Sequence, residues 1–396
     1  MLRFLTAGES HGQALVGIIE GLPAGVEISQ EYINRQLSRR RGGYGRGGRM
    51  NIEADEVRVV SGVRNGKTLG SPVALLIENR DYPNWEELMS PGETTGEGKS
   101  VIRPRPGHAD LAGGMKYAHR DMRNVLERAS ARETAMRVAL GAVCRRVLEE
   151  FRIRIYSQVI SIGAVRAESI PVDMNNIDQV MATVEASPVY CGHRDKSIQM
   201  VDEIQKAKQE GESLGGSFEV GVLNLPPGLG SYGQWDRRLD SRLSAALMSI
   251  PAIKAVEIGE GFASSEQPGS RVHDEILYNE NRGLYRATNR AGGIEGGITN
   301  GEKVWARAYM KPIPTLYRPL TSVNTRTWQV ETAQVERSDI CAVPAAAVVG
   351  EAVTAWVVAD AFLEKFGGDG LEEIRANYVT YLDYLGRVWQ WKRTLY

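Results

Sequence analysis

The sequence predicts an α+β fold in which helices and antiparallel sheets form a sandwich. Segments with strand and helix patterns alternate irregularly along the 396 residues, and several neighbouring strands are separated only by short turns, as in hairpins. No stretch of disordered composition divides the chain. These observations favour an α+β sandwich over a regular doubly wound sheet, in which strands and helices would alternate strictly.

In the first part of the chain we expect strands at Leu2–Leu5, Val16–Pro23, Val57–Val63 and Ser71–Glu78. The last two flank Asn65-Gly66, a strong hairpin signal. Ser29 can cap a helix over Gln30–Arg40 that stops at the following glycines. Residues 81–100 are polar and rich in Pro and Gly, which indicates a long surface loop. Ser130-Ala-Arg-Glu133 has capping-box spacing and begins an apolar-periodic helix that runs to about Phe151.

In the remainder we expect strands at Ile153–Val165, Ser217–Leu225 and Lys303–Met310, and helices at Asn175–Ala186, Asp195–Gln209, Leu239–Ser249, after Asp339 and near Leu371–Leu385. The stretch Ser264–Gly301 has no clear period. Two similar Ala/Val-rich helices follow Arg128-Ala-Ser130 and Arg337-Ser-Asp339. This echo fits either a pseudo-duplicated architecture or a chance likeness between two amphipathic helices.

Composition and charge are those of a cytoplasmic globular protein. Hydrophobic residues make up 42% of the chain and the net charge is −1, which argues against a protein that is basic overall. The three cysteines are far apart, as expected for reduced thiols, and the N-terminus contains no signal-peptide pattern. The longest apolar stretch, Ile340–Leu363, contains Glu351 and Asp360, so a buried helix is a better interpretation than a membrane span.

Three familiar motifs fail on context. Gly43-Tyr-Gly-Arg-Gly-Gly48 satisfies GxGxxG but follows a helical segment rather than a buried strand, so it does not predict a dinucleotide fold. Gly98-Lys-Ser100 lacks the glycine spacing of a P-loop. The five histidines show no spacing typical of a metal site. Nothing in the sequence therefore requires a metal.

The segment Arg39–Arg49 also resembles the RGG tracts of RNA-binding proteins. It holds arginines, a tyrosine and no acid, so it could follow a phosphate backbone. RGG tracts, however, usually repeat within long disordered regions, whereas this segment is single and lies between ordered elements. A compact anion-binding loop is the favoured interpretation, and RNA binding is the alternative.

Two histidine loops are candidate sites of proton transfer. Gly8-Glu-Ser-His-Gly12 sets His11 between glycines, which let a ligand approach the backbone closely. In Arg103-Pro-Arg-Pro-Gly-His-Ala-Asp110, arginines and His108 share a proline-stiffened loop. Imidazole suits proton transfer near neutral pH. For each histidine alone, a structural role in its loop is an equally good interpretation.

Two helix starts are candidate anion sites. At Arg128-Ala-Ser130-Ala-Arg132, helix amides and guanidinium groups could bind a phosphate together, or the motif is a plain capping box with surface arginines. At Arg337-Ser-Asp339 an arginine and a carboxylate stand together, and a simple Asp N-cap is the alternative.

The motifs occur in a fixed order: GESHG, RRRxGYGRGxRM, RPGHADLAG, RASARET, RAGGIEGGITNG, MKPIPT and RSDxCAVPAA, from residue 8 to residue 346. Together they resemble the chorismate synthase family over nearly the whole chain. The resemblance implies one β–α–β sandwich domain over residues 1–396, typically assembled as a homotetramer. It implies the 1,4-anti elimination of phosphate from 5-enolpyruvylshikimate 3-phosphate, with reduced FMN (FMNH2) required although no net redox change occurs.

The resemblance also implies roles for individual residues. His11 corresponds to the histidine that protonates the departing phosphate, and His108 to the one that protonates the reduced flavin near N1. Asp339 corresponds to the carboxylate that acts with flavin N5 in removing the C6 proton. The implied substrate or NADP ligands are Arg40, Arg46, Arg49 and Arg132. The implied flavin contacts are Arg128, Ala129, Ser130, Pro251, Ala252, Gly296, Lys311, Pro312, Ile313, Pro314, Thr315 and Arg337.

The substrate is a small molecule, and the resemblance implies no nucleic-acid or membrane partner. Its phosphate and two carboxylates give a physical reason for so many arginines, because guanidinium forks match these groups. Pro251 has no backbone N–H, so a contact there must use its carbonyl or its surface. The resemblance leaves open whether NADPH reduces the flavin on this protein or an external reductant does so.

Overall fold

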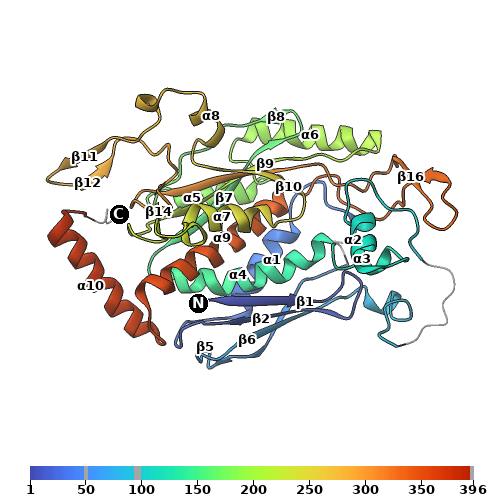
Figure 1. Cartoon of the computed structure of the whole chain (residues 1–396), viewed down its shortest axis with the longest axis horizontal. Coiled ribbons are helices and arrows are strands. Elements are labelled where there is room, and N and C mark those ends of the chain that lie inside the picture. The colour runs from blue at the N-terminus through green and yellow to red at the C-terminus, as the bar shows by residue number, and fades with distance from the viewer. Residues whose placement is uncertain (49–51, 93–99, 393–396) are drawn as a thin grey trace.

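The computed structural model describes residues 1–48, 52–92 and 100–392. Two antiparallel sheets enclose a layer of helices (Figure 1). The first sheet has the order β1-β2-β6-β3 and the second the order β10-β15-β9-β7-β8. This arrangement confirms the predicted α+β sandwich. One buried apolar cluster joins residues of both sheets and of the helices between them. The single domain over residues 1–396 stays a prediction.

The strands of the first sheet are β1 (Arg3–Ala7), β2 (Ala14–Glu20), β6 (Val73–Glu78) and β3 (Val57–Ser61). Those of the second are β10 (Ile253–Ile258), β15 (Val304–Met310), β9 (Gly216–Leu223), β7 (Arg154–Ile162) and β8 (Val165–Arg166). Short two-stranded pairs add β4 (Val63–Arg64) with β5 (Lys67–Thr68), β11 (Ile276–Asn279) with β12 (Gly283–Arg286), β13 (Ile294–Glu295) with β14 (Ile298–Thr299), and β16 (Thr321–Val323) with β17 (Val330–Thr332).

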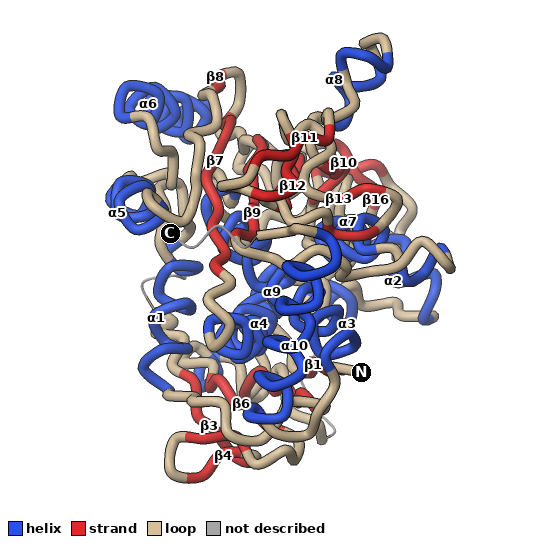
Figure 2. Tube along the Cα trace, turned by 90° about the vertical axis from the view of Figure 1, so that its left-hand side faces the viewer, coloured by secondary structure: helices blue, strands red, loops and turns tan. Residues whose placement is uncertain are grey.

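The helical layer contains α1 (Gln30–Arg41), α4 (Thr134–Glu149), α7 (Leu239–Met248) and α9 (Val343–Phe366). The shorter α2 (Asp110–Tyr117), α3 (Arg123–Leu126) and α8 (Gly261–Ser265), and the outer α5 (Ile177–Ala186), α6 (Arg194–Glu210) and α10 (Leu371–Trp389), complete the helices. Figure 2 shows α4 and α9 between the two sheets and α5 and α6 beside β7.

The central pair of helices separates the sheets. α4 packs on β2 and β6, α9 packs on β7 and β9, and the two helices pack against each other. They approach closely because a Cβ on Gly141 would lie 2.5 Å from the Cβ of Ala352, so glycine is needed at this crossing. α9 is the one helix in the described ranges that is long and apolar enough to cross a membrane, and 94% of its most apolar window is buried. It is a core helix, as predicted.

The carboxylate within α9 explains how an acidic residue tolerates this core. Glu351 accepts hydrogen bonds from Arg39 (2.7 and 2.8 Å), Arg145 (2.6 Å) and Ser157 (2.7 Å). Burial alone would raise the pKa of Glu351, but the two arginines and Ser157 outweigh it and lower the pKa to about 2. The ionised carboxylate thus ties α9 to α1, α4 and β7.

Local sequence signals account for several elements. Ser29 caps α1 by accepting from the Tyr32 amide at 3.1 Å, as predicted. Asn65 and Gly66 have φ of 50° and 72°, the left-handed values that a two-residue hairpin turn requires at both positions, and they join β4 to β5 while β3 pairs with β6.

Other predictions were incomplete. The strand β10 and the helices α2 and α3 were not predicted. The predicted capping box at Ser130 is half formed: Ser130 Oγ accepts from the Arg132 amide at 3.3 Å, but Glu133 pairs with Arg137 instead of returning to the cap. The stretch Ser264–Gly301, for which no period was found, contains two short hairpins, β11–β12 and β13–β14.

Candidate active site

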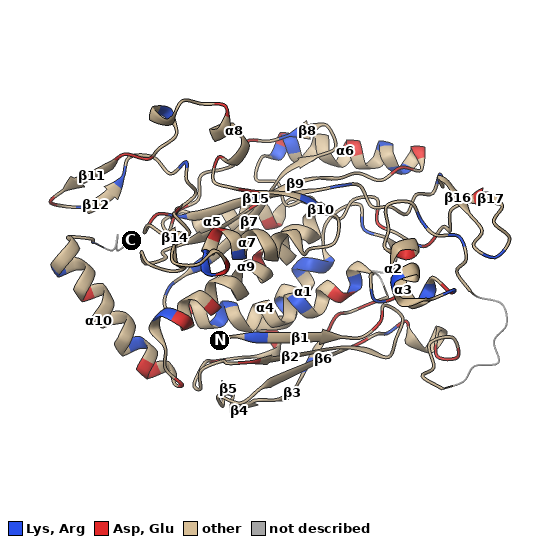
Figure 3. Cartoon of the chain, viewed as in Figure 1, with Lys and Arg blue, Asp and Glu red and all other residues tan. Residues whose placement is uncertain are grey.

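A cavity of about 400 Å³ opens where α4 begins beside α3, between the helical layer and the loops that follow β1 and β15. This volume is within the usual range for small-molecule sites. Six cationic side chains, two carboxylates and two histidines line it: Arg40, Arg46, Arg105, Arg132, Arg337, Lys311, Glu336, Asp339, His11 and His108. Basic and acidic residues both occur along the whole ribbon (Figure 3), and the net charge of the chain is −1, so the excess of cations among the lining residues is local.

His11 is held by a buried carboxylate and an aromatic ring. Its backbone amide donates to Glu127 Oε2 at 2.8 Å, and its Nδ1 lies 3.0 Å from both carboxylate oxygens of Glu127. The imidazole stacks on Trp85 with ring centroids 4.0 Å apart. The Ser10 hydroxyl reaches Ser130 Oγ at 3.1 Å, so the GESHG loop is joined to the start of α4.

His108 has a carboxylate partner within its own loop. Nδ1 of His108 lies 2.5 Å from Asp110 Oδ1, and Arg105 grips the same carboxylate through Nε at 2.8 Å and a terminal nitrogen at 3.1 Å. Arg105 also donates to Thr315 Oγ1 at 2.9 Å. Burial alone would raise the pKa of Asp110, but the hydrogen bonds from His108 and Arg105 outweigh it and hold the pKa well below its usual range.

Asp339 is held by the Gly/Arg loop that follows α1. It accepts from the Gly47 amide at 2.6 Å and pairs with Arg46 at 2.9 Å. A Cβ on Gly47 would lie 2.9 Å from the Ser338 carbonyl oxygen, so the glycines of this loop allow close backbone approach. The helix α9 has Ala342 as its N-cap, with no side-chain cap. Asp339 is therefore not an Asp N-cap.

The guanidinium groups of Arg40 and Arg132 form the buried floor of the cavity. Arg40 donates to Thr134 Oγ1 at 3.0 Å and to the Ala131 carbonyl at 2.9 Å. Arg132 donates to Asn79 Oδ1 at 3.0 Å and pairs with Asp55. Burial, reinforced by neighbouring arginines, lowers the pKa of Arg40 to about 10. Arg132 is buried, so the alternative of a capping box with surface arginines does not hold for this residue.

The same burial weakens the RNA alternative. The side chain of Arg39 is 11% exposed and is committed to Glu351, and that of Arg40 is 3% exposed. Arg46 faces the cavity and pairs with Asp339. These arginines do not present a continuous basic surface to solvent, as a nucleic-acid backbone would require.

The loop after β15 forms an opposite wall. Lys311 donates to the Gly107 carbonyl at 2.6 Å, and its backbone amide bonds to the Ala252 carbonyl at 2.9 Å. Burial, followed by the charge of Lys254, lowers the pKa of Lys311. Pro251, Ala252, Ile313 and Pro314 add apolar surface. This wall therefore combines apolar side chains with one cation.

Most residues implied by the family resemblance meet at this cavity. Those that line it are His11, Arg40, Arg46, His108, Ala129, Ser130, Arg132, Pro251, Ala252, Lys311, Ile313, Pro314, Thr315, Arg337 and Asp339. Pro312 lies between lining residues without lining the cavity itself. Arg128 points away and donates to the Thr6 and Gly8 carbonyls, and Gly296 is exposed in the β13–β14 turn. Arg49 is outside the described residues. Ligand binding by each of them stays a prediction.

Three contributors were not singled out from the sequence. Glu127 and Trp85 contact His11, and Asp55 pairs with Arg132 and Arg40. Asp55 has a φ of 51°, which is rare for a residue with a side chain. No local pattern marks Glu127 or Trp85, because their partner lies far away in the sequence. A left-handed backbone at an isolated aspartate carries no sequence signature either.

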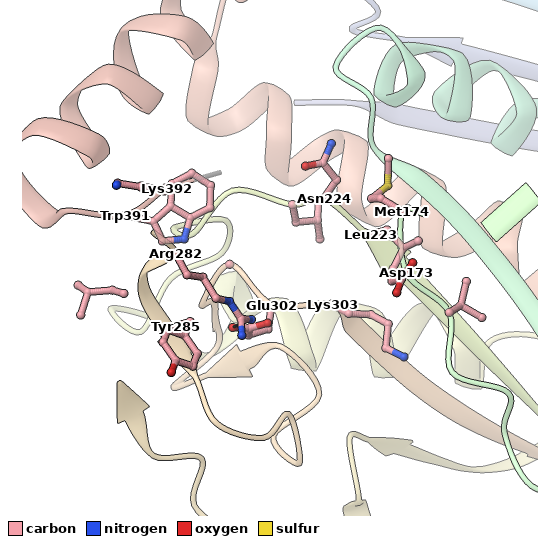
Figure 4. Close-up of a pocket in the computed structure, with 14 residues that line it drawn as sticks. Asp173, Met174, Leu223, Asn224, Arg282, Tyr285, Glu302, Lys303, Trp391 and Lys392 are labelled. Carbon is pink, nitrogen blue, oxygen red and sulfur yellow. Dashed lines mark hydrogen bonds and ion pairs between the residues drawn. The ribbon is translucent and has the colours of Figure 1, made fainter. Parts of the chain in front are cut away.

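A second hollow of about 150 Å³ lies between β9, the β11–β12 hairpin and the end of α10. Figure 4 shows Arg282 beside Glu302, with Trp391 and Tyr285 nearby. Arg282 reaches Glu302 at 3.4 Å and stacks on Tyr285 with its guanidinium 4.3 Å from the ring centroid. The hollow is smaller than the cavity at α4, and the described residues that line it include no histidine and none of the residues expected at the site. The cavity at α4 is therefore the candidate active site.

A model of the chorismate synthase family matches residues 2–363. The chain belongs to the chorismate synthase family. A chorismate synthase of Syntrophomonas wolfei subsp. wolfei is 62% identical over 394 residues, covering 99% of this chain and all of the relative. One from Desulforudis audaxviator is 57% identical, covering 97% of this chain and 98% of the relative. A crystal structure of chorismate synthase, 45% identical, superposes with a TM-score of 0.80 and covers 98% of both chains.

Membership of the chorismate synthase family accounts for the motif order, since the match extends from the first strand into α9 and so spans every histidine, arginine and aspartate that lines the cavity. The near-complete coverage of the relatives means that both sheets and the helical layer belong to the shared fold.

Proposed function

We propose that this chain catalyses the 1,4-anti elimination of phosphate from 5-enolpyruvylshikimate 3-phosphate to give chorismate, the last common step of the shikimate pathway to aromatic amino acids. It acts as a phosphate-eliminating carbon–oxygen lyase with reduced FMN as cofactor. The observation that carries the proposal is the cavity at α4, in which two carboxylate-bound histidines, Asp339 and six cationic side chains meet.

The charge of the cavity suits the substrate, which has one phosphate and two carboxylates. Arg40, Arg46 and Arg132 are the proposed substrate ligands, and Arg49 belongs with them by the family motif. Guanidinium groups can bind each anion through two parallel hydrogen bonds. The fixed positions of Arg40 and Arg132, which are already hydrogen-bonded to Thr134 and Asn79, reduce the entropy lost when the substrate binds.

Three groups handle protons in the proposed reaction. The imidazolium of His11 donates a proton to the departing phosphate, so that no trianion has to leave. His108, whose Nδ1 is hydrogen-bonded to Asp110, supplies the proton near flavin N1. Asp339, next to Arg46, takes part in removing the proton from C6 of the substrate. The buried carboxylates behind both histidines orient each ring before the substrate arrives.

The cavity also fits a reduced flavin. Pro251, Ala252, Ile313 and Pro314 offer apolar surface for the ring system, and Lys311 and Arg337 offer cations for anionic groups. Ala129, Ser130, Pro312 and Thr315 complete the proposed flavin contacts at the cavity. Arg128 and Gly296, which do not line it, belong with them by the family motifs alone. When bound, reduced FMN supplies an electron that transiently weakens the allylic C–O bond. The residues of this chain supply orientation, charge and the exclusion of water.

An anaerobic assay tests the proposal. The purified chain with 5-enolpyruvylshikimate 3-phosphate and reduced FMN should release one phosphate per chorismate formed, and the same mixture with oxidised FMN should not. Absence of phosphate release with reduced FMN would refute the proposal. Tight, salt-sensitive RNA binding without flavin affinity would support the alternative based on Arg39–Arg49.

Three further properties belong to the proposal. The chain forms a homotetramer in the cytoplasm, with neither nucleic acid nor membrane as a partner. NADPH serves as the flavin reductant only if the protein reduces its own flavin. Oxidation of NADPH by the purified chain with FMN separates a bifunctional protein from one that needs an external reductant.

A further inference from the structure

The family motifs do not explain why the Glu127 carboxylate lies against Nδ1 of His11. Glu127 follows α3 and lies 116 residues from His11 in sequence. Its side chain is 2% exposed, against 13% for the histidine it contacts. The carboxylate bonds to the backbone amide of His11 and to ring Nδ1 at the same time. It therefore fixes both the loop and the ring.

The hydrogen bonds of Glu127 determine which ring nitrogen carries a proton. Oε2 accepts from the His11 backbone amide at 2.8 Å, and Oε1 accepts from the Arg123 guanidinium at 3.1 Å. Both of these partners can only donate, so both oxygens are acceptors. Nδ1 of His11 lies 3.0 Å from each of these two acceptor oxygens. It must carry hydrogen, and proton exchange with a ligand in the cavity then falls to Nε2.

The negative charge of Glu127 also favours hydrogen on Nδ1 of His11. Burial alone would raise the pKa of Glu127, but the hydrogen bonds from His11, and then the charge of Arg123, outweigh it and keep the pKa below its usual range. The carboxylate is therefore ionised at neutral pH, and a negative charge at Nδ1 stabilises the imidazolium form. The other charged groups facing this pair are Arg123 and, across the cavity, Arg40, Arg46, Arg105, Arg132, Arg337, Lys311, Glu336 and Asp339.

We propose that Glu127 is the positioning residue for the phosphate-protonating acid: it holds His11 with hydrogen on Nδ1 and stabilises the imidazolium, so that Nε2 donates the proton. This inference rests on the proposed function. As the substrate C–O bond breaks, the proton on Nε2 moves to a phosphate oxygen. The ring becomes neutral with hydrogen kept on Nδ1, and Glu127 stays ionised throughout.

Glu127→Gln is the sharpest test, because an amide cannot satisfy this site. Whichever way the amide turns, its NH2 group meets a donor, either the His11 backbone amide or Arg123. We expect kcat to fall on the order of 100-fold, with KM changed less than about 3-fold. The alkaline limb of the kcat profile should move to lower pH by about 1 unit, because a neutral partner no longer stabilises the imidazolium.

Two further variants separate positioning from general structural damage. Glu127→Asp keeps the charge and should retain more activity than Glu127→Gln, with the alkaline limb near that of the unaltered chain. Glu149→Gln removes another partly buried carboxylate with an arginine at i−4, outside the cavity. It should leave kcat and the pH profile unchanged. Equal kcat and equal pH profiles for Glu127→Gln and the unaltered chain would overturn the proposal.

A measurement without turnover keeps this inference distinct from the proposed function. With ¹⁵N-labelled histidine, the five histidines give resolvable ring signals, and His11→Gln identifies those of His11. At high pH the unaltered chain should show hydrogen on Nδ1 of His11, and Glu127→Gln should shift it toward Nε2. Hydrogen on Nε2 in the unaltered chain would overturn the inference even if neither variant folds. The expected tautomer without phosphate release would refute the proposed function and leave standing only the assignment of hydrogen to Nδ1 of His11 by Glu127.

Discussion

The His108 loop supplies its own carboxylate, Asp110, whereas the His11 loop takes Glu127 from a segment 116 residues away. In the first case the pair is two residues apart and Arg105 grips the carboxylate from the side. In the second the carboxylate lies at the Nδ1 edge of the ring and also binds the backbone amide of the loop. The same imidazole–carboxylate contact is therefore made once by local sequence and once by the tertiary fold.

The two histidine–carboxylate pairs therefore differ in which parts of the fold hold them in place. The His108 pair depends on one loop, and its geometry is set by the proline-stiffened segment and by Thr315, which receives the other end of Arg105. The His11 pair depends on how the β1–β2 turn meets α3, so any shift between the first sheet and the start of α4 moves the acid relative to its carboxylate. Substitutions should accordingly affect the two histidines in different ways.

The largest expected effect is the loss of either histidine. In His11→Ala, kcat should fall by about 10²–10⁴, the range typical of a general acid, with unchanged affinity for reduced FMN. In His108→Ala, kcat should fall similarly and the affinity for reduced FMN should fall as well. Anaerobic phosphate release and flavin titration measure the two quantities. His119→Ala, which alters a histidine outside the cavity, is the control. Equal flavin affinity in both cavity variants would remove the distinction between the histidines.

The second effect concerns acid stability. The pKa of Asp110 in the folded protein lies well below its ordinary value, so the unfolded chain binds the proton first. The stability this group contributes is complete above about pH 4 and is lost as the pH falls below that value. Asp110→Asn should cost on the order of 3 kcal/mol at pH 7, because Arg105 stays buried with one partner fewer, and should make Tm less dependent on pH below 4.

Thermal unfolding between pH 7 and pH 3 measures the slope of Tm against pH. Asp178→Asn is a suitable control, since its aspartate is 83% exposed and pairs with Arg154 at the surface. It should change stability by less than about 1 kcal/mol. A slope for Asp110→Asn equal to that of the unaltered chain would mean that the Asp110 carboxylate contributes nothing to acid stability.

Features that depend on neighbouring residues could be predicted from the sequence. The Asn65-Gly66 turn, the Ser29 cap and the buried nature of α9 follow from short-range rules, and the structure confirms each. The RPGHAD loop likewise carries histidine, arginine and aspartate within six residues. The α+β class was predictable because strand and helix patterns alternate irregularly along the chain and several neighbouring strands are separated only by short turns.

The remainder required the tertiary fold. α2 was not predicted because its two central glycines, Gly113 and Gly114, are poor helix formers. They are needed because a Cβ at either position would come within 3.0 Å of a side chain, Val125 or Met122. Glu127 could not be linked to His11 because no periodicity joins residues 116 positions apart. For Arg128, a motif match suggested a ligand, while the structure directs its side chain to β1.

Asp339 provides a third geometry, in which the loop backbone itself holds the carboxylate. Gly47→Ala would bring a Cβ to 2.9 Å from the Ser338 carbonyl and 3.3 Å from an Asp339 oxygen. We expect kcat to fall about 10-fold, since small displacements of a positioned group are costly. Gly48→Ala is the matched control, because nothing lies within 4 Å of its Cβ position, and it should keep full activity. Similar kcat values for the two variants would contradict close packing of the loop on Asp339.

The smallest expected effect is the loss of kcat when the aromatic neighbour of His11 is replaced. His11 stacks on Trp85 at 4.0 Å, and no ring contact involves His108 among the residues that the structure describes. Such stacking contributes roughly 0.5–1.5 kcal/mol, so Trp85→Leu should lower kcat by about 2- to 10-fold. The tautomer of His11 should persist, because Glu127 rather than Trp85 sets it. Trp235→Leu, which removes a ring 76% exposed to solvent, should leave kcat unchanged. If Trp85→Leu also shifted hydrogen from Nδ1 to Nε2, the ring stack and not the carboxylate would be the main determinant of the acid's orientation.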